Sequence, residues 1–210
     1  MNVKTFDRNS MGQNIYLVWD DATKEGVLID AGANEADENA IVAAIQDEGI
    51  TVKAILLTHG HYDHITGLER LKNLTGAKVY CHASEKNMLA DPEINLSSRI
   101  KQKIAAAPDE TLNDGDTIAV GQSVLKVLHT PGHTPGGVCF YDADGGSLFS
   151  GDTLFSGSVG RTDFPMGDHG KLIRNITVKL LSLPADTVVY PGHGGTTTIG
   201  HEKKANPFLK

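Results

Sequence analysis

Three histidines and one aspartate stand close together in Thr58-His59-Gly60-His61-Tyr62-Asp63-His64. The segment directly follows the apolar run 54–57, which is typical of a short buried strand. Side chains two residues apart in an extended chain point the same way, so the first two histidines can share one metal ion. The chain then turns, and the aspartate and the last histidine can face a second ion. The alternative is a surface loop that is rich in histidine by chance.

Three further donors favour a metal site over a chance cluster, because each follows a short apolar run and is bracketed by glycine or proline. They are His133 in segment 130–136, Asp152 in segment 149–153 and His193 in segment 189–194. These surroundings are typical of loops at strand ends, where a rigid sheet can hold ligands in place. Imidazole and carboxylate suit zinc, and also iron or manganese. The seven side chains therefore predict two divalent metal ions, with zinc as the first choice.

Apolar runs and helix caps divide the chain into two similar halves. The first half has strand-like runs at 14–19 and 26–30, then a helix at 35–48 with Asn34 as its N-cap and Gly49 as its stop. The second half repeats the theme, with strand-like runs at 124–128, 137–141, 147–149 and 187–190 and a helical stripe at 172–180. This pattern favours two sheets packed face to face with helices outside, an α+β fold of the αββα sandwich type. Segment 84–108 is predicted to be mostly helical or irregular.

Length and composition predict a single domain over residues 1–210, because a chain of this length can bury a sizeable core. The net charge of −7 argues against nucleic acid as a partner. No apolar run approaches the roughly 18 residues that cross a membrane, and the N-terminus lacks an apolar stretch of signal-peptide type. Cys81 and Cys139 are not in a paired spacing, so we expect reduced thiols in a cytoplasmic protein, with a disulfide as the alternative. The sequence predicts no oligomeric state.

The ordered set His-x-His-x-Asp-His, followed by His, Asp and His, resembles the metallo-β-lactamase fold superfamily. The pattern covers the chain from Gln13 to its end. Within that superfamily, Gly157-Ser158-Val159-Gly160-Arg161-Thr162-Asp163-Phe164 and the ending at 198–208 are similar to short glyoxalase II-like (hydroxyacylglutathione hydrolase-like) metallohydrolases. The resemblance implies the same αββα sandwich.

The resemblance also implies a division of the ligands between two metal ions. The first ion takes His59, His61 and His133, the second takes Asp63, His64 and His193, and Asp152 bridges the two. Two divalent ions, two carboxylates and one bridging hydroxide give a net site charge of about +1, which favours hydroxide at neutral pH. Asp63 is the expected catalytic residue, since it orients this hydroxide. A positive site is also expected to attract an anionic substrate.

Three function classes follow from these residues. The first is a dinuclear metallohydrolase that cleaves a thioester such as S-lactoylglutathione, in which metal-bound hydroxide attacks the carbonyl carbon and the thiolate leaves without a strong general acid. The second is a mononuclear iron dioxygenase that acts on glutathione persulfide, which the chain also resembles at 64–67 and 160–164. The third is a non-catalytic metal-binding protein. A secreted β-lactamase is disfavoured by the N-terminus, by His64 and by Asp152 in place of a cysteine, and an RNA-processing nuclease by the charge.

Arg161 is the candidate substrate-binding residue, because a guanidinium can clamp a carboxylate with two hydrogen bonds. The alternative is a surface ion pair with Asp163 or Asp168. Only about seventeen residues follow His193, so we expect no C-terminal helical domain of the kind that binds glutathione in glyoxalase II. The identity of the thiol carrier is therefore left open.

Four other polar residues have weaker signals. Asp30 ends a strand and is expected to brace the ligand loop or to serve as a plain turn residue. His82 follows a strand and is a candidate for the edge of the cleft, and His129 is expected to be a core histidine or a support for a ligand. His169 and His201 are expected to face solvent.

Overall fold

Two six-stranded sheets form the centre of the fold in the computed structural model, which describes residues 1–7 and 12–210. The strands of the first sheet lie in chain order: β1 (Asn2–Phe6), β2 (Ile15–Trp19), β3 (Glu25–Ile29), β4 (Thr51–Leu56), β5 (Lys78–His82) and β6 (Glu110–Leu112). The first three strands are antiparallel, and β3 to β6 are parallel. The parallel strands therefore end at one edge of the sheet.

The second sheet has the order β14-β13-β10-β9-β8-β7. Its strands are β7 (Thr117–Val120), β8 (Ser123–His129), β9 (Val138–Asp142), β10 (Ser147–Gly151), β13 (Val188–Pro191) and β14 (Thr197–Thr198). Neighbouring strands are antiparallel except for the parallel pair β10 and β13. A small separate hairpin joins β11 (Leu154–Phe155) to β12 (Ser158–Val159).

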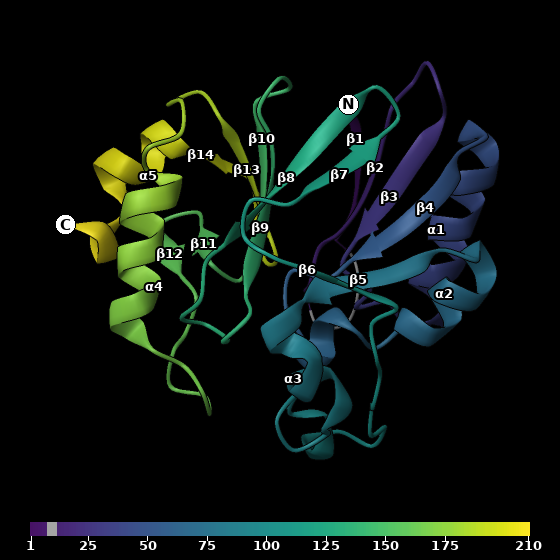
Figure 1. Cartoon of the computed structure of the whole chain (residues 1–210), viewed down its shortest axis with the longest axis horizontal. Coiled ribbons are helices and arrows are strands. Elements are labelled where there is room, and N and C mark those ends of the chain that lie inside the picture. Colours follow the sequence, from purple (N-terminus) through teal and green to yellow (C-terminus); the bar gives the residue numbers. More distant parts are fainter. Residues whose placement is uncertain (8–11) are drawn as a thin grey trace.

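Helices lie on the outer side of each sheet, as Figure 1 shows, with α1 and α2 at one end of the molecule and α4 and α5 at the other. Their bounds are α1 (Glu35–Glu48), α2 (Leu68–Thr75), α4 (His169–Asn175) and α5 (Ile199–Ala205), and α4 runs on into a π-helical turn (Ile176–Leu180). The short α3 (Lys86–Ala90) follows β5. No helix within residues 1–7 and 12–210 is long and apolar enough to cross a membrane.

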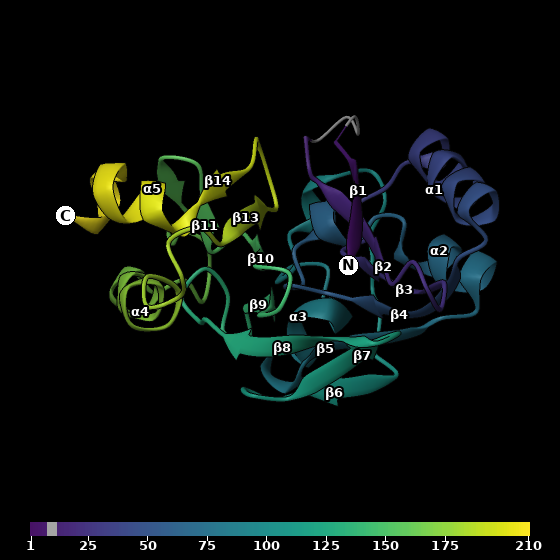
Figure 2. The same cartoon turned by 90° about the horizontal axis from the view of Figure 1, so that it is seen from above.

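The buried side chains form three layers of core, which confirms the αββα sandwich. Leu17 belongs to the cluster that also holds Ile41 of α1, whereas its neighbour Val18 packs in the cluster between the sheets. The third cluster holds Leu172 of α4 and residues of the second sheet. Successive residues of a strand point to opposite faces, so a strand buried on both faces needs an unbroken apolar run. Figure 2 shows the sheets between the two groups of helices.

The caps of α1 agree with the sequence prediction. The Asn34 side chain accepts hydrogen bonds from the backbone amides of Ala36 and Asp37, and the Asp37 side chain accepts one from the amide of Asn34. Gly49 ends the helix at φ 66°, in the left-handed region that glycine tolerates. Segment 84–108 contains α3 and two 3₁₀ turns (Ala83–Glu85 and Ser97–Arg99), joined by irregular chain.

Candidate metal centre

Every predicted metal donor lies in a loop that leaves the carboxyl end of a strand. The loop with the first four donors follows β4, whereas His133, Asp152 and His193 follow β8, β10 and β13. The last three strands run in the same direction, because β8 and β10 are both antiparallel to β9 and β13 is parallel to β10. Their loops therefore emerge at one edge of the second sheet, where they meet the loop from the first sheet.

These loops bring all seven predicted donors into overlapping groups. Within each group, one nitrogen or oxygen atom per residue lies within 4.8 Å of the others. The groups are His59 with His61 and His133; His59 with His64 and Asp152; and Asp63 with His64 and His193. Seven donors exceed the four that one tetrahedral ion uses, so the cluster indicates a dinuclear metal site. The assignment of each donor to one ion stays a prediction.

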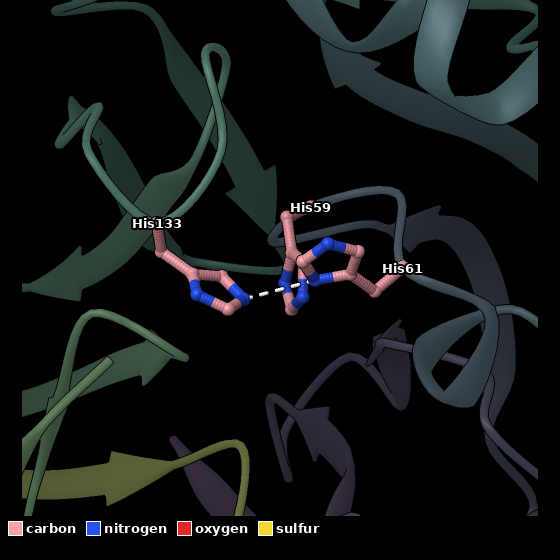
Figure 3. Close-up of side chains that lie close together, drawn as sticks. All are labelled: His59, His61 and His133. Carbon is pink, nitrogen blue, oxygen red and sulfur yellow. Dashed lines mark hydrogen bonds between the residues drawn. The ribbon is translucent and has the colours of Figure 1, made fainter. Parts of the chain in front are cut away.

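Three histidines from two loops converge at one side of the cluster, as Figure 3 shows. His61 Nδ1 lies 2.9 Å from His133 Nε2, and the His59 ring stands edge-on to both. All three side chains are buried. Two ring nitrogens at this distance repel each other through their lone pairs unless a proton or a cation lies between them.

Hydrogen bonds on the far side of two rings fix which nitrogen faces the cluster. His133 Nδ1–H donates to the Arg161 carbonyl at 2.7 Å, and His193 Nδ1–H donates to the Gly12 carbonyl at 3.0 Å. The Nε2 atom of each neutral ring therefore keeps its lone pair for the cluster. His193 Nε2 lies 3.2 Å from Asp63 Oδ2, so this carboxylate faces the same space.

Asp30 orients two more of the histidines, as the sequence suggests for a residue that braces the ligand loop. Its carboxylate accepts the Thr58 amide, the Thr58 hydroxyl and His64 Nδ1–H, each at 2.8 Å. Because the Thr58 hydroxyl donates its one proton to Asp30, it accepts a hydrogen bond from His59 Nδ1–H at 3.1 Å. His59 and His64 therefore also present Nε2 to the cluster.

The protonation states of His59, His61 and Asp63 suit metal binding. Burial, helped by His64 and His133, lowers the pKa of His59 well below its usual range. Burial and then His133 lower the pKa of His61 to about 3. Burial raises the pKa of Asp63, but the charge of His64 and the hydrogen bond from His193 outweigh it, so this pKa lies below the usual value. Neutral imidazole and ionised carboxylate are the forms that ligate metals.

His64 shows that the cluster favours a positive charge. Burial lowers its pKa, but the carboxylates of Asp30, Asp152 and Asp63 outweigh burial and raise this pKa well above its usual range. Burial raises the pKa of Asp152, but His64, His133 and His193 together outweigh burial and lower this pKa below its usual value. A metal cation would meet the same demand for positive charge between these carboxylates.

Two buried atoms show that the residues fit such an ion. His59 Nε2 has no hydrogen-bond partner in the part of the chain that the structure describes. Asp152 Oδ1 likewise makes no hydrogen bond there, although it lies 3.3 Å from His64 Nε2. Buried polar atoms are rarely left without a partner, and a metal ion would provide one for both.

Gly192, directly before His193, allows the loop after β13 to approach the cluster closely. A Cβ atom at this position would lie 2.3 Å from Asp152 Oδ1 and 2.8 Å from His64 Cε1. Both distances are far below van der Waals contact, so a side chain here would displace two donors. Packing therefore requires glycine at position 192.

A cavity of about 390 Å³ opens onto the cluster. Donors form its floor, and its walls are formed by Leu96, Phe155, Val159, Arg161 and Phe164. Phe164 packs edge-on against His61, with 5.6 Å between ring centroids. The cavity combines an apolar wall with a polar floor, as small-molecule sites do.

Arg161 lines this cavity, but its guanidinium already has a partner. Nε and Nη2 donate to the two carboxylate oxygens of Asp163, each at 2.7 Å, and Cζ lies 3.8 Å from the centre of the Phe164 ring. The ion pair with Asp163, which the sequence offers as one alternative, is present, and the one with Asp168 is not observed. Arg99, which the sequence does not single out, has Cζ 5.6 Å from the centre of the same ring.

The other histidines lie outside the cluster. His82, a candidate for the edge of the cleft, does not line the cavity; it stacks on His129 with ring centroids 3.9 Å apart. His129 Nε2–H donates to the Pro135 carbonyl, which places it as a support beneath the His133 loop. His169 and His201 are exposed, as predicted.

Comparison with known proteins defines the family. The model of the metallo-β-lactamase superfamily matches residues 9–193, and the chain belongs to that superfamily. A hydroxyacylglutathione hydrolase, GloC, from Haemophilus influenzae is 37% identical over 212 residues, covering 100% of this chain and 98% of that protein. Together with the His/Asp cluster, these matches identify a metallohydrolase of this superfamily.

Two solved structures match over the full length of both chains. One is the B3 metallo-β-lactamase BLEG-1, with a TM-score of 0.92 and 39% identity. The other is a protein in a di-iron-bound form, with a TM-score of 0.83 and 37% identity. The fold is therefore that of a metallo-β-lactamase, and one relative holds two metal ions in it.

Proposed function

We propose that this chain is a dinuclear metallohydrolase that cleaves a thioester of an anionic thiol, such as S-lactoylglutathione. The observation that carries the proposal is the continuous cluster of seven donors at the floor of a half-apolar cavity. Two divalent ions bound there would supply Lewis acidity and a water molecule with a lowered pKa. The name of the Haemophilus influenzae relative supports the thioester as the bond that is cleaved.

The chain's own residues would position the reactants. Asp63 Oδ2 lies beside His193 Nε2 at the floor of the cavity, where it would orient the attacking water by accepting a hydrogen bond. Leu96 and Val159 would pack against the acyl group and exclude bulk water. A thiolate leaves readily, since thiol pKa values are about 8.5, so no strong general acid is needed in the cavity.

Two guanidinium groups at Phe164 would hold the anionic part of the substrate. Arg161 is more than half exposed and shares its charge with Asp163. Arg99 is exposed and makes no ion pair with the residues described here. We therefore propose that Arg99 binds a substrate carboxylate more strongly. Arg161 would assist once its ion pair with Asp163 is broken.

Zinc is the proposed metal, with iron or manganese as alternatives, because imidazole and carboxylate donors suit all three. The di-iron form of a 37% identical relative favours iron more than the donor types alone do. A cytoplasmic location is proposed from Cys81 and Cys139, both buried and free. Burial raises the pKa of Cys81 to about 12, so this thiol stays protonated and resists oxidation.

Two other activities have a specific observation in their favour. β-Lactam hydrolysis is favoured by the match to BLEG-1, and it would use the same donors and cavity. An iron-dependent persulfide dioxygenase is favoured by the groups of two histidines and one carboxylate, which is a donor set of non-haem iron oxygenases.

The test is a comparison of substrates on one preparation, loaded separately with zinc, iron and manganese. S-lactoylglutathione, a neutral small thioester, a chromogenic cephalosporin and glutathione persulfide are supplied in turn, with oxygen uptake recorded for the last. We expect a kcat/KM of about 10⁴ M⁻¹s⁻¹ or more for the anionic thioester and no oxygen uptake. Faster hydrolysis of the cephalosporin, or stoichiometric oxygen uptake with iron, would replace the proposal by the matching alternative.

A further inference from the structure

Glu85 is a fully buried carboxylate that the metal cluster does not contain. It ends the 3₁₀ turn after β5 and has 0% exposed surface. No lysine, arginine or histidine makes an ion pair with it among residues 1–7 and 12–210. A buried carboxylate without a positive partner is unfavourable unless hydrogen bonds replace its water, so the contacts of Glu85 need an explanation.

The two carboxylate oxygens of Glu85 connect the two ligand loops. Oε2 accepts the backbone amide of Gly60 at 2.8 Å, and Oε1 accepts the backbone amide of Gly136 at 2.6 Å. Gly60 lies between His59 and His61 in the loop of the first sheet. Gly136 lies three residues after His133 in the loop of the second sheet. One side chain thus links the backbones on both sides of the three-histidine group.

Glu85 is also packed tightly between these loops. A Cβ atom on Gly136 would lie 2.7 Å from Glu85 Cγ, and one on Gly60 would lie 3.2 Å from Glu85 Oε2. The loop at Gly136 therefore approaches Glu85 at a separation that leaves no room for a Cβ atom, and at Gly60 a Cβ atom would make a tight contact. The carboxylate and its two hydrogen bonds therefore bridge the gap between the two loops.

We infer that Glu85 is a positioning residue, which holds the ligand loops of the two sheets at the separation that lets His59, His61 and His133 reach one metal ion. The 2.9 Å between His61 Nδ1 and His133 Nε2 is the distance that this link maintains. Glu85 does not itself face the cavity. The inference rests on the metal centre and not on the proposed substrate.

The chemistry of the link requires a carboxylate. Both oxygens accept from backbone N–H groups, so each must carry a lone pair. Glutamine has the same shape but only one acceptor, and its NH₂ group would face a second N–H donor. Aspartate keeps both acceptors but is shorter by one methylene group, so it cannot span the same gap.

Glu202 offers a matched control. It is also 0% exposed, and its oxygens accept hydrogen bonds from the Gly157 amide, the Asn206 side chain and the Thr197 hydroxyl. It links the β11–β12 turn to the C-terminal segment and contacts neither loop of the three-histidine group. E202Q should therefore lose stability as E85Q does, because in both variants a buried carboxylate loses one acceptor. Unlike E85Q, E202Q should leave metal binding unchanged.

The experiment measures metal binding and not turnover. Metal-free wild type, E85Q and E202Q are titrated with Zn²⁺ against a chromophoric chelator, and the Co²⁺-substituted proteins are compared by absorption spectroscopy. Residues that orient metal ligands typically change affinity about 10–100-fold, so E85Q should weaken the binding of at least one ion about ten-fold and alter the Co²⁺ spectrum. E202Q should lose thermal stability but keep the wild-type affinity and spectrum.

Wild-type affinity and spectrum in E85Q would overturn the inference, and so would an equal loss of affinity in E202Q. If E85Q does not fold, E85D decides, because it keeps both acceptors and should fold with weakened binding. Wild-type binding in E85D would then reduce Glu85 to a purely structural role.

Discussion

Asp63 is one of the donors that are exposed to the cavity. Its side chain is 20% exposed, compared with 0% for His64 beside it. A carboxylate in this position can contact both a metal ion and a water molecule. The strands that form the core do not depend on it, so its loss should affect chemistry more than folding.

We predict that Asp63→Ala abolishes turnover while the protein stays folded. A positioned proton acceptor contributes about 10²–10⁴-fold to rate, and the variant should lose at least that much. The measurement is kcat with S-lactoylglutathione, with circular dichroism and a melting curve as the check on folding. Near-normal activity would show that Asp63 does not orient the reacting water.

Arg161 and Arg99 should act on binding and not on the chemical step. A hydrogen bond to a charged group contributes about 1.5–3 kcal/mol, whereas an exposed ion pair contributes about 0–1 kcal/mol. Arg161→Ala and Arg99→Ala should each raise KM for the anionic thioester about ten-fold, with the larger effect at Arg99. A neutral thioester is the control and should be almost unaffected. An equal loss on both substrates would indicate a structural role, and no loss on either would place the residue away from the substrate.

The seven donors could be found from the sequence because each has local context: four share one segment, and the other three follow apolar runs. Glu85 has no such context. It is a single acidic residue in an irregular segment, and its partners Gly60 and Gly136 lie 25 and 51 residues away in the chain. Only the packing of the two sheets brings them together. Arg99 also lacks local sequence context, so the sequence does not indicate it.

At the scale of elements, the loop after β13 depends on the absence of a side chain at Gly192. We predict that Gly192→Ala lowers metal content by at least about ten-fold, since a Cβ would press on Asp152 and His64. Gly195→Ala is the matched control, because a Cβ there meets no atom within 4 Å. Elemental analysis of both variants after the same loading makes the comparison, and equal metal content in the two would contradict the prediction.

The N-terminus of α1 offers a test of stability. Asn34→Ala removes the acceptor for the amides of Ala36 and Asp37, which typically costs about 1 kcal/mol. For a chain of this size, the melting temperature should fall by about 2–4 °C. Asn34→Asp keeps the acceptor and should melt close to the wild type in a scanning calorimeter. A wild-type melting temperature in Asn34→Ala would mean that packing alone fixes the start of α1.

Sequence patterns predict the central elements better than the edges. The sequence predicts β2, β3 and β9 because both of their faces are buried and each contains an unbroken apolar run. β1 and β7 lie at sheet edges with mixed exposure, and β6 and β14 have only three and two residues. Their pairing depends on the neighbouring strand more than on their own sequence. In the irregular segment 84–108, the apolar residues follow no helical or strand period, so the sequence does not indicate where its elements begin and end.

At the scale of the whole molecule, each of the two sheets supplies part of the donor cluster. The first sheet supplies His59, His61, Asp63 and His64, and the second supplies His133, Asp152 and His193. The layer of core between the sheets therefore sets how the two sheets are placed, and with it the approximate distance between the two halves of the donor cluster. The sandwich could be predicted from the repeated pattern of strands and helices, but the separation of the loops could not, because it arises only when the sheets pack.

The central claim is that the cluster binds two metal ions. The most direct test is elemental analysis of the chain after loading with Zn²⁺, Fe²⁺ or Mn²⁺ and removal of free metal. We predict two ions per chain with at least one of these metals, because seven donors exceed what one ion can use. A stoichiometry of one ion per chain with all three metals would contradict the dinuclear site and favour the mononuclear iron dioxygenase.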